Sequence, residues 1–458
     1  MPTVTNPNIL YVFADQWPAH VAGYAGNPDV QTPRIDAFAA ESVNCRYAMA
    51  NTPVCTPSRA TLMTGLLPDR HGLFLNDAPL DPTLVSLGKH FAAAGYDTAY
   101  IGKWHMDGHG RSAFIPPDRQ HGFGYWKALE CTHDYNASRY YENGDPTPRT
   151  WPDYDAIAQT DDAISYLTER SRDRPFFMMM SWGPPHNPYH TAPERYKALY
   201  DPATLNVRPN VPEDHREATR RTLGGFYAHC SALDACFGRL LDALEELGLA
   251  GETIVVFTSD HGDHLGSHYL AEKQSPLEES LRVPFLVRWP GRLPVSVNDT
   301  VVSVLDVFPT LCGLSGTACP EGLQGRDFSR ELAAGTAPPA SDNFGFCAGY
   351  HLFGTWPHQH RNKPVPKHLH AREYRGIRTT RYTYCEDLNG PWLLFDNATD
   401  PCQLNNLIGN PAFEEHQKEL AERLRSRMIE YGDAFSPGME YVNQWGYDVD
   451  ASGTIRVR

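Results

Sequence analysis

Two apolar segments far apart in the chain each end in side chains that can bind a metal ion. These side chains are Asp15 and Gln16 after residues 8–14, and Asp260 and His261 after residues 253–259. Two carboxylates and an amide offer mostly oxygen ligands, which suit Ca²⁺ or Mg²⁺ better than Zn²⁺. The imidazole softens the set enough to admit Mn²⁺ as well. We therefore expect one divalent cation, with Ca²⁺ as the first choice.

Each of these segment ends also has an ordinary structural interpretation. An aspartate after a strand often caps the next helix, and residues 260–263 could form a polar turn rich in Asp and Gly. Both segments are continuously apolar, however, as buried parallel strands are. Ligands of open α/β sheets bind beyond the carboxyl ends of such strands. A shared metal site is therefore the favoured interpretation.

A third segment supplies a candidate nucleophile. The run CTPSRATLMTG at residues 55–65 resembles the signature of the type I sulfatases of the alkaline phosphatase superfamily. In that family a formylglycine-generating enzyme oxidises the cysteine to Cα-formylglycine (3-oxoalanine). The resemblance implies that Cys55 is converted in this way and then acts as nucleophile and metal ligand. The structural alternative is a buried cysteine before a helix that has proline in its first turn.

Further segments extend the resemblance over most of the chain. Residues 101–105 are similar to the family segment whose lysine and histidine reach the substrate sulfate and the nucleophile. Residues 184–188 resemble the loop with a second substrate-facing histidine, and residues 273–284 match the sulfate-binding lysine and the strand that follows it. The resemblance implies that these side chains act on or bind the substrate: Arg59, Asn76, Lys103, His105, His186 and Lys273.

These residue types suit the hydrolysis of a sulfate monoester. A divalent ion and lysines can hold the non-bridging oxygens, and histidines can exchange protons with the leaving alcohol. A hydrated formylglycine carries two hydroxyls, of which one, acidified by the metal, can attack sulfur and expel the alcohol. The other hydroxyl can then eliminate sulfate and regenerate the aldehyde. We expect a sulfuric ester hydrolase that acts on carbohydrate or aryl sulfates.

Two positions depart from the pattern most often described for the family. Gln16 stands where a second aspartate is frequent, and His261 where an asparagine is frequent. The related phosphonate monoester and phosphodiester hydrolases share these variants, so such a hydrolase is the alternative function. Lys103 and His105 favour sulfate, because the phosphonate hydrolases tend to carry uncharged residues there. A catalytically silent binding protein is the third hypothesis, if Cys55 is never converted.

The composition limits the partners and the compartment. A net charge of −15 argues against nucleic acid or heparin-like surfaces as obligatory partners, and favours small sulfated molecules or single sugars at a chain end. No apolar run approaches the length of about eighteen residues that a membrane span needs. No secretory leader precedes the first apolar segment. We expect a cytoplasmic protein without membrane contact, or a periplasmic or secreted one if a leader is removed.

Alternating strand and helix patterns predict an α/β catalytic domain over residues 1–335, with a large, mixed, mostly parallel sheet flanked by helices. Besides the two apolar strands, the predicted elements are strands at 98–102 and 176–182 and helices at 82–94, 155–170 and 217–247. The last helix carries an apolar stripe that should pack on the sheet.

A smaller C-terminal subdomain is predicted for residues 336–458, after a break rich in Ala and Pro. Strands at 374–385 and 392–397 and a helix at 411–431 resemble the small antiparallel sheet with one helix of the sulfatases. We expect this subdomain to wall one side of the pocket. Exposed edges of its sheet could support a homo-oligomer.

Five histidines and a tryptophan lie in the segment 350–370. Three interpretations stay open, which are a surface loop, a substrate-recognition loop and an independent transition-metal site. We expect at least one of these residues to approach the pocket. The residues are His351, Trp356, His358, His360, His368 and His370.

Overall fold

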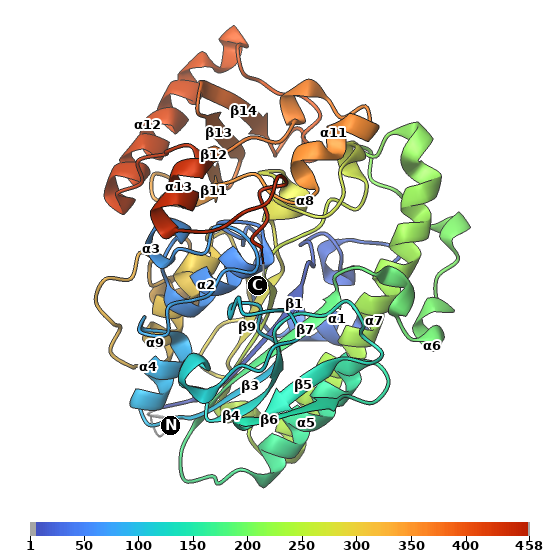
Figure 1. Ribbon diagram of the computed structural model, residues 1–458, viewed down its shortest axis with the longest axis vertical. Helices are drawn as coiled ribbons and strands as arrows, with labels where there is room; N and C mark the ends of the chain where they lie inside the picture. The colour runs from blue at the N-terminus through green and yellow to red at the C-terminus, as the bar shows by residue number, and fades with distance from the viewer. Residues whose placement is uncertain (1–5, 457–458) are drawn as a thin grey trace.

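A ten-stranded sheet forms the centre of the computed structural model, which describes residues 6–456 (Figure 1). Its strands run in the order β10-β2-β9-β8-β1-β7-β3-β4-β5-β6. Parallel pairs join β8, β1, β7, β3 and β4, and antiparallel pairs join β8 to β9, β9 to β2, β4 to β5 and β5 to β6. The strands are β1 (Asn8–Asp15), β2 (Val43–Cys45), β3 (Asp97–Lys103), β4 (Tyr125–Leu129), β5 (Arg139–Glu142), β6 (Asp145–Thr150), β7 (Phe176–Pro185), β8 (Thr253–Ser259), β9 (Phe285–Arg288) and β10 (Ser296–Asn298).

All residues of the central strand β1 are buried. Because successive side chains point to opposite sides of a sheet, both faces of the strand are covered. Ile9, Tyr11 and Phe13 pack into one hydrophobic cluster. Leu10, Val12 and Ala14 pack into a second cluster on the other face. The continuous apolar run is therefore explained by two cores, one on each side of the sheet.

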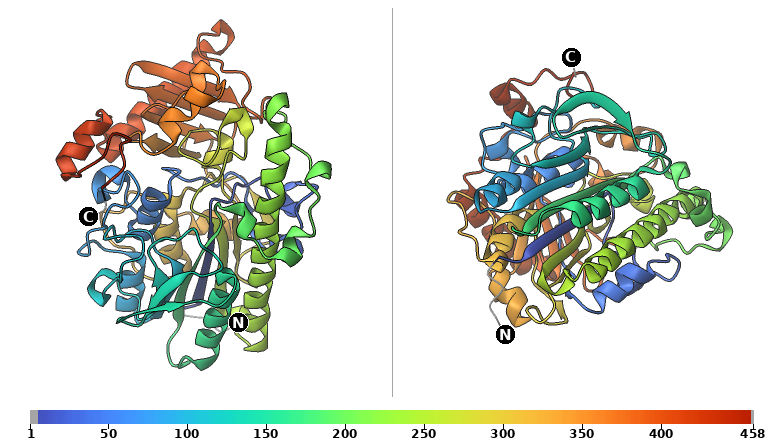
Figure 2. Two further views of the ribbon diagram at one scale, coloured as in Figure 1. Left: turned by 45° about the vertical axis from the view of Figure 1, so that its right-hand side comes forward. Right: turned by 90° about the horizontal axis from the view of Figure 1, so that it is seen from below.

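Helices cover both faces of the large sheet. One face carries α1 (Pro33–Ala39), α5 (Asp155–Glu169) and α7 (Arg216–Glu246), and the other carries α2 (Cys55–Thr64), α4 (Leu87–Ala93) and α9 (Val307–Ser315) (Figure 2). The apolar stripe of α7 packs on the sheet as predicted. This arrangement confirms the predicted α/β fold.

A four-stranded antiparallel sheet forms the C-terminal part, at the top of Figure 1. Its strands are β11 (Phe344–Gly349), β12 (Tyr374–Thr379), β13 (Tyr382–Asp387) and β14 (Gly390–Asp396). The long helix α12 (Glu414–Tyr431) contacts β12 and β13. The small sheet with one helix across it is confirmed, whereas a domain boundary at residue 335 stays a prediction.

Three predicted elements differ in the structure. The predicted strand 374–385 is a hairpin, because Thr379 Oγ1 accepts the backbone N–H groups of Arg381 and Tyr382 and turns the chain. The helix expected from residue 82 begins only at Leu87, since Ser86 caps it. Within residues 278–284, where a strand was expected, the short helix α8 (Glu278–Leu281) forms, and β9 follows it.

The remaining helices are short and connect these layers. They are α3 (Pro68–His71), α6 (Glu194–Lys197), α10 (Ser329–Ala334), α11 (Gln359–Asn362) and α13 (Gly438–Trp445). Within residues 6–456, none of the helices combines the length and the hydrophobicity that a membrane crossing requires.

Candidate active site

The ends of β1 and β8 bring two carboxylates together. The two strands are parallel neighbours with Ala14 opposite Ser259, so Asp15 and Asp260 leave the sheet at the same edge. The backbone N–H of Gln16 donates to Asp260 Oδ1 at 3.1 Å and ties the two strand ends to each other. Both carboxylates are buried. The sheet register therefore produces a pair of acids that solvent does not reach.

Cys55 completes a compact group of potential metal ligands with these acids. It is the first residue of α2 and is 1% exposed. Its sulfur lies 3.6 Å from Asp15 Oδ1 and 3.2 Å from His261 Nε2. The ligand atoms of Asp15, Cys55, Asp260 and His261 all lie within 4.8 Å of one another. The sequence-based expectation that two strand ends and one cysteine converge is confirmed.

Arg59 orients both carboxylates. Its Nη2 donates to Asp15 Oδ2 at 3.0 Å and its Nε donates to Asp260 Oδ2 at 2.9 Å. The Oδ1 atoms of both acids are left facing His261 Nε2, each at 3.6 Å. Arg59 lies one helical turn after Cys55, so α2 supplies both the thiol and the group that orients its neighbours.

The electrostatics of the two acids fit a bound cation. Burial and the neighbouring Asp15 raise the pKa of Asp260. Burial and Cys55 raise that of Asp15, but Lys103, His186 and Arg59 outweigh them, so its pKa lies below the ordinary value. Two buried carboxylates with oxygens on one side are best compensated by a divalent ion between them. The residues present therefore fit a hard, oxygen-preferring metal.

Lys103 lies against the same group from β3. Its Nζ is 2.5 Å from Asp15 Oδ2 and 3.9 Å from Cys55 Sγ. Burial raises the pKa of Cys55, but Lys103, Lys273 and His261 together hold it well below the usual value. The position of Cys55 therefore favours an anionic atom.

Gln16 and His186 share Lys273. Lys273 Nζ lies 2.5 Å from Gln16 Oε1 and 2.7 Å from His186 Nε2. Gln16 in turn donates to Asp263 Oδ2 at 2.6 Å. Gln16 has a φ of 70°, a left-handed conformation that costs about 1–2 kcal/mol and is concentrated at functional sites. Whether Gln16 also ligates a metal stays a prediction, since its amide oxygen already accepts from Lys273.

His105 is held by a carboxylate that the sequence did not reveal as functional. Its Nε2 lies 3.3 Å from Asp77 Oδ1, and the buried Nδ1 has no hydrogen-bond partner among the described residues. Asp77 also accepts two bonds from Arg111. Asp77 is 28 positions from His105, so only the folded chain shows the pair. Its one sequence signal is that it directly follows Asn76.

Asn76 contacts the helix that carries Cys55. Its Oδ1 accepts the backbone N–H of Thr56 at 3.1 Å, one of the groups that a helix start leaves unpaired. Thr56 Oγ1 donates to the carbonyl of His105 at 2.8 Å. Asn76 is therefore placed to fix α2, and its contact with substrate stays a prediction.

The histidine-rich segment contacts the chain two residues before Lys273. Gln359 exchanges two hydrogen bonds with the backbone of Ala271, each 2.9 Å long. The rings of His360 and His370 stack on each other with centroids 4.2 Å apart. A direct contact of these histidines with the predicted site residues stays a prediction.

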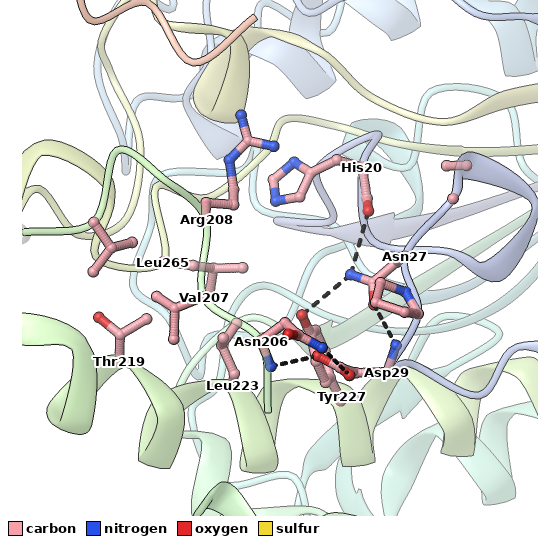
Figure 3. Close-up of a pocket in the computed structure, with 14 residues that line it drawn as sticks. His20, Asn27, Asp29, Asn206, Val207, Arg208, Thr219, Leu223, Tyr227 and Leu265 are labelled. Atoms are coloured by element: carbon pink, nitrogen blue, oxygen red, sulfur yellow. Dashed lines mark hydrogen bonds between the residues drawn. The ribbon is translucent and has the colours of Figure 1, made fainter. Parts of the chain in front are cut away.

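A cavity of about 270 Å³ lies between α7 and the segment 20–29 (Figure 3). His20, Arg208 and Tyr227 line it together with apolar side chains of α7 and its surroundings. None of the predicted site residues lines this cavity. It is a feature separate from the group around Cys55.

A set of ligands for a divalent cation beside buried lysines is the arrangement of a hydrolase that acts on an anionic ester. A family model described as "Sulfatase" matches residues 7–317, and one described as "N-sulphoglucosamine sulphohydrolase, C-terminal" matches residues 266–430. The chain belongs to the sulfatase family, and it is a sulfuric ester hydrolase.

Individual relatives agree with this assignment. The chain is 42% identical to the ulvan-active sulfatase of Formosa agariphila, over 97% of this chain and 85% of the relative. It is 33% identical to the endo-4-O-sulfatase of Bacteroides thetaiotaomicron, over 92% of this chain and 91% of the relative. A solved structure from work on glycosaminoglycan metabolism in that bacterium superimposes with a TM-score of 0.82 at 30% identity, covering 96% of this chain and 99% of the other.

Proposed function

We propose that the protein hydrolyses sulfate monoesters of carbohydrates, with Cys55 converted to formylglycine as the nucleophile. The observation that carries the proposal is the position of Cys55 among Asp15, Asp260 and His261, with ligand atoms within 4.8 Å of one another. A carbohydrate substrate is supported by the names of two relatives, the ulvan-active sulfatase and the endo-4-O-sulfatase. Family membership favours a sulfate ester over the phosphonate or phosphodiester alternative.

In this proposal, three buried side chains bind the sulfate group. Near Cys55, Lys103 donates to Asp15 and Lys273 donates to Gln16. His186 accepts from Lys273 through Nε2 and donates from Nδ1 to the backbone carbonyl of Asn187. The two lysines offer N–H donors to the non-bridging oxygens in a buried site, where such interactions are strongest, and His186 would add a donor only with a proton on Nε2 as well.

His105 is the proposed proton donor to the leaving alcohol. Burial lowers the pKa of His105, but Cys131 and Asp77 raise it, and the net pKa lies well above the ordinary value. Asp77 holds Nε2, so the unpartnered Nδ1 is the atom available to the bridging oxygen. A protonated imidazole at this position would supply the charge that the departing oxygen needs.

Asp15, Gln16, Asp260 and His261 would hold the cation, together with an oxygen of the converted Cys55. The sulfur in the structure takes the place of that oxygen. We propose Ca²⁺, with Mg²⁺ and Mn²⁺ as the alternatives. When bound, the ion would offset the paired carboxylates and favour the ionised form of the nucleophile.

The first test concerns the conversion of Cys55. Peptide mass mapping should find the residue 55 peptide with the mass of the aldehyde in active protein, made with a formylglycine-generating enzyme. Cys55→Ala should lower kcat on a sulfate ester by at least about 10⁴-fold, because the nucleophile is lost. Cys45→Ala, which removes another buried thiol, serves as the matched control. A fully active Cys55→Ala enzyme would refute the proposal.

The second test concerns the reaction and the substrate. An aryl sulfate and an aryl phosphodiester are compared as substrates, followed by a panel of sulfated mono- and disaccharides. The proposal expects sulfate esters to be hydrolysed with the higher kcat/KM, and at least one saccharide to exceed the aryl sulfate. A higher kcat/KM on the phosphodiester would favour the alternative function.

A further inference from the structure

A second, polar cavity of about 210 Å³ opens where β4 ends and β5 begins. It is separate from the sulfate-binding groups described above, none of which lines it. Its lining includes two arginines, two acids, a cysteine and a tyrosine: Arg111, Arg139, Glu130, Asp134, Cys131 and Tyr141.

This cavity adjoins the proposed catalytic centre through two contacts. Arg111 donates to Asp77 at 3.0 and 2.9 Å, and the same carboxylate holds His105. Cys131, on the cavity wall, is buried, and the charges of nearby His105 and Lys103 lower its pKa. Asp77 therefore connects the cavity, through Arg111, with His105.

The two arginines keep donors available. Arg111 uses Nε and Nη2 for Asp77, and its Nη1 has no hydrogen-bond partner in the part of the chain that the structure describes. Within the same residues the Arg139 side chain has neither a hydrogen bond nor an ion pair. Arg139 is exposed and belongs to the short strand β5, which lies between β4 and the edge strand β6. An arginine beside a polar cavity without a protein partner is a ready-made site for an oxyanion.

The two acids of the lining are engaged elsewhere. The Glu130 carboxylate accepts the backbone N–H groups of Met106, Asp107 and Gly108 and is 2% exposed. Asp134 accepts the backbone N–H of Asn136 at 3.4 Å within its own loop. Asp134 is the exposed carboxylate that an anion in the cavity would meet, and the same lining carries two guanidinium groups.

The cavity in Figure 3 differs in this respect. Asp29 there accepts the backbone and side-chain N–H groups of Asn206, and Asn27 donates to Tyr227. Arg208 donates to Glu279. Its charged groups are thus largely paired within the protein, whereas Arg139 is not.

We propose that the cavity with Arg111 and Arg139 binds an oxyanion on the sugar next to the one that bears the scissile sulfate. The oxyanion is the carboxylate of a uronic acid or a second sulfate, both of which match the guanidinium fork. The inference rests on the proposed function, because it assumes a saccharide substrate. Arg139 would then be a specificity-determining residue, and the enzyme would prefer saccharides with two acidic groups.

The test compares three disaccharides that each carry one scissile sulfate ester. The neighbouring sugar is a glucuronate in the first, its methyl ester in the second, and a second sulfated sugar in the third. The readout is the ratio of kcat/KM for each acidic disaccharide to that for the methyl ester. Arg139→Gln should lower the ratio about 10- to 100-fold through KM, as expected for the loss of a charged hydrogen bond. Arg149→Gln on β6 removes the same charge outside the cavity and should leave the ratio unchanged.

The first and third disaccharides distinguish a carboxylate from a sulfate as the preferred oxyanion. Calorimetry with the glucuronate disaccharide that lacks the sulfate ester tests binding to the cavity without turnover. Arg139→Gln should weaken this binding by the same factor of about 10 to 100. If no sulfate ester is hydrolysed but this binding depends on Arg139, the proposed function fails and the cavity assignment stands. An unchanged ratio in Arg139→Gln, no binding to the unaltered protein, or binding that is independent of Arg139 would overturn the inference.

Discussion

At the scale of single residues, Arg59 is the group on which the arrangement of the metal ligands depends. Its guanidinium is 1% exposed and donates to Asp15, Asp260, Ser181 and the carbonyl of Lys103. A buried guanidinium is tolerated only when its donors are satisfied, as they are here. Because Arg59 binds the Oδ2 atoms, the Oδ1 atoms of both acids face His261, although Asp260 Oδ1 also accepts the backbone N–H groups of Gln16 and His261. Arg59 thus fixes the direction in which the acids face.

Removal of the divalent cation is expected to destabilise the protein. A chelator should lower Tm, because the repulsion between Asp15 and Asp260 is then offset only by neighbouring side chains such as Arg59 and Lys103. Added Ca²⁺ should restore Tm, with a stabilisation of about 2.7 kcal/mol at a hundredfold excess over Kd. Thermal denaturation at increasing Ca²⁺, Mg²⁺ or Mn²⁺ measures the effect and ranks the metals. Asp260→Asn should lose the response, and Asp107→Asn, which alters a buried acid paired with Arg119, should keep it. A Tm indifferent to chelator and metal would contradict the site.

Asp77 is expected to act as a positioning residue for His105. Asp77→Asn removes the charge that supports a protonated imidazole, so kcat should fall by about 10²–10⁴-fold for poor leaving groups. The loss should shrink for aryl sulfates with acidic phenols, which depart without a proton. Kinetics on a series of substituted phenyl sulfates measures this dependence. A loss that is equal for all leaving groups would indicate a merely structural role, and Asp107→Asn is the matched control.

At the scale of elements, the parts of the fold with a strong local pattern could be predicted from the sequence. The continuous apolar runs of β1 and β8 and the helical stripe of α7 mark buried strands and an amphipathic helix. The sequence of the exposed strand β6 resembles a loop, because it contains two prolines. The strand accommodates them because it lies at the edge of the sheet. Asp77 and Arg139 were not found either, since their significance comes from neighbours that are distant in sequence. The local sequence pattern thus predicts strands and helices, whereas residues such as Asp77 are recognised only from the contacts that the folded chain makes.

The start of α5 is expected to make stability depend on pH. Burial raises the pKa of Asp155 to about 7, although Ser138 donates to it. A carboxyl whose pKa is higher in the folded state than in the unfolded state, about 3.9, stabilises the fold at low pH and loses this contribution as pH rises to about 7. The loss amounts to about 3–4 kcal/mol between pH 4 and pH 7.

Urea denaturation midpoints at several pH values test this prediction. The midpoint of Asp155→Asn should fall less between pH 4 and pH 7 than that of the unaltered protein. Asp161→Asn, an exposed acid of the same helix, should leave the pH profile as it is. Parallel profiles for Asp155→Asn and the unaltered protein would show that Asp155 is not the group responsible.

At the scale of the whole molecule, the two sheets are joined beside the proposed sulfate-binding site. Arg378 of β12 donates to both oxygens of Glu278 in α8, at 3.0 and 2.9 Å, and both residues are buried. Glu278 follows Lys273 by five positions in the chain. The C-terminal sheet therefore supports the segment that carries Lys273, and its role as a wall of the pocket stays a prediction.

Breaking this contact between the sheets is expected to be costly. Arg378→Gln leaves the buried Glu278 carboxylate with only the longer contact to Arg282 Nη1 at 3.4 Å, and should destabilise the protein by about 3 kcal/mol, with a rise in KM as Lys273 loses support. Urea denaturation and sulfate ester kinetics measure the two effects. Arg423→Gln, which breaks an ion pair on the surface of α12, should cost less than about 1 kcal/mol. The double variant Arg378→Gln with Glu278→Gln should recover part of the loss, and no recovery would argue against the pair.

The burial of Cys55 limits when this residue can be modified. A side chain that is 1% exposed at the start of a fully buried helix is out of reach of another enzyme once the two cores have formed. If Cys55 is oxidised by a separate catalyst, that encounter has to take place while the polypeptide is still extended. Conversion of Cys55 then has to precede folding, and a molecule that folds first keeps an unmodified cysteine and has no nucleophile.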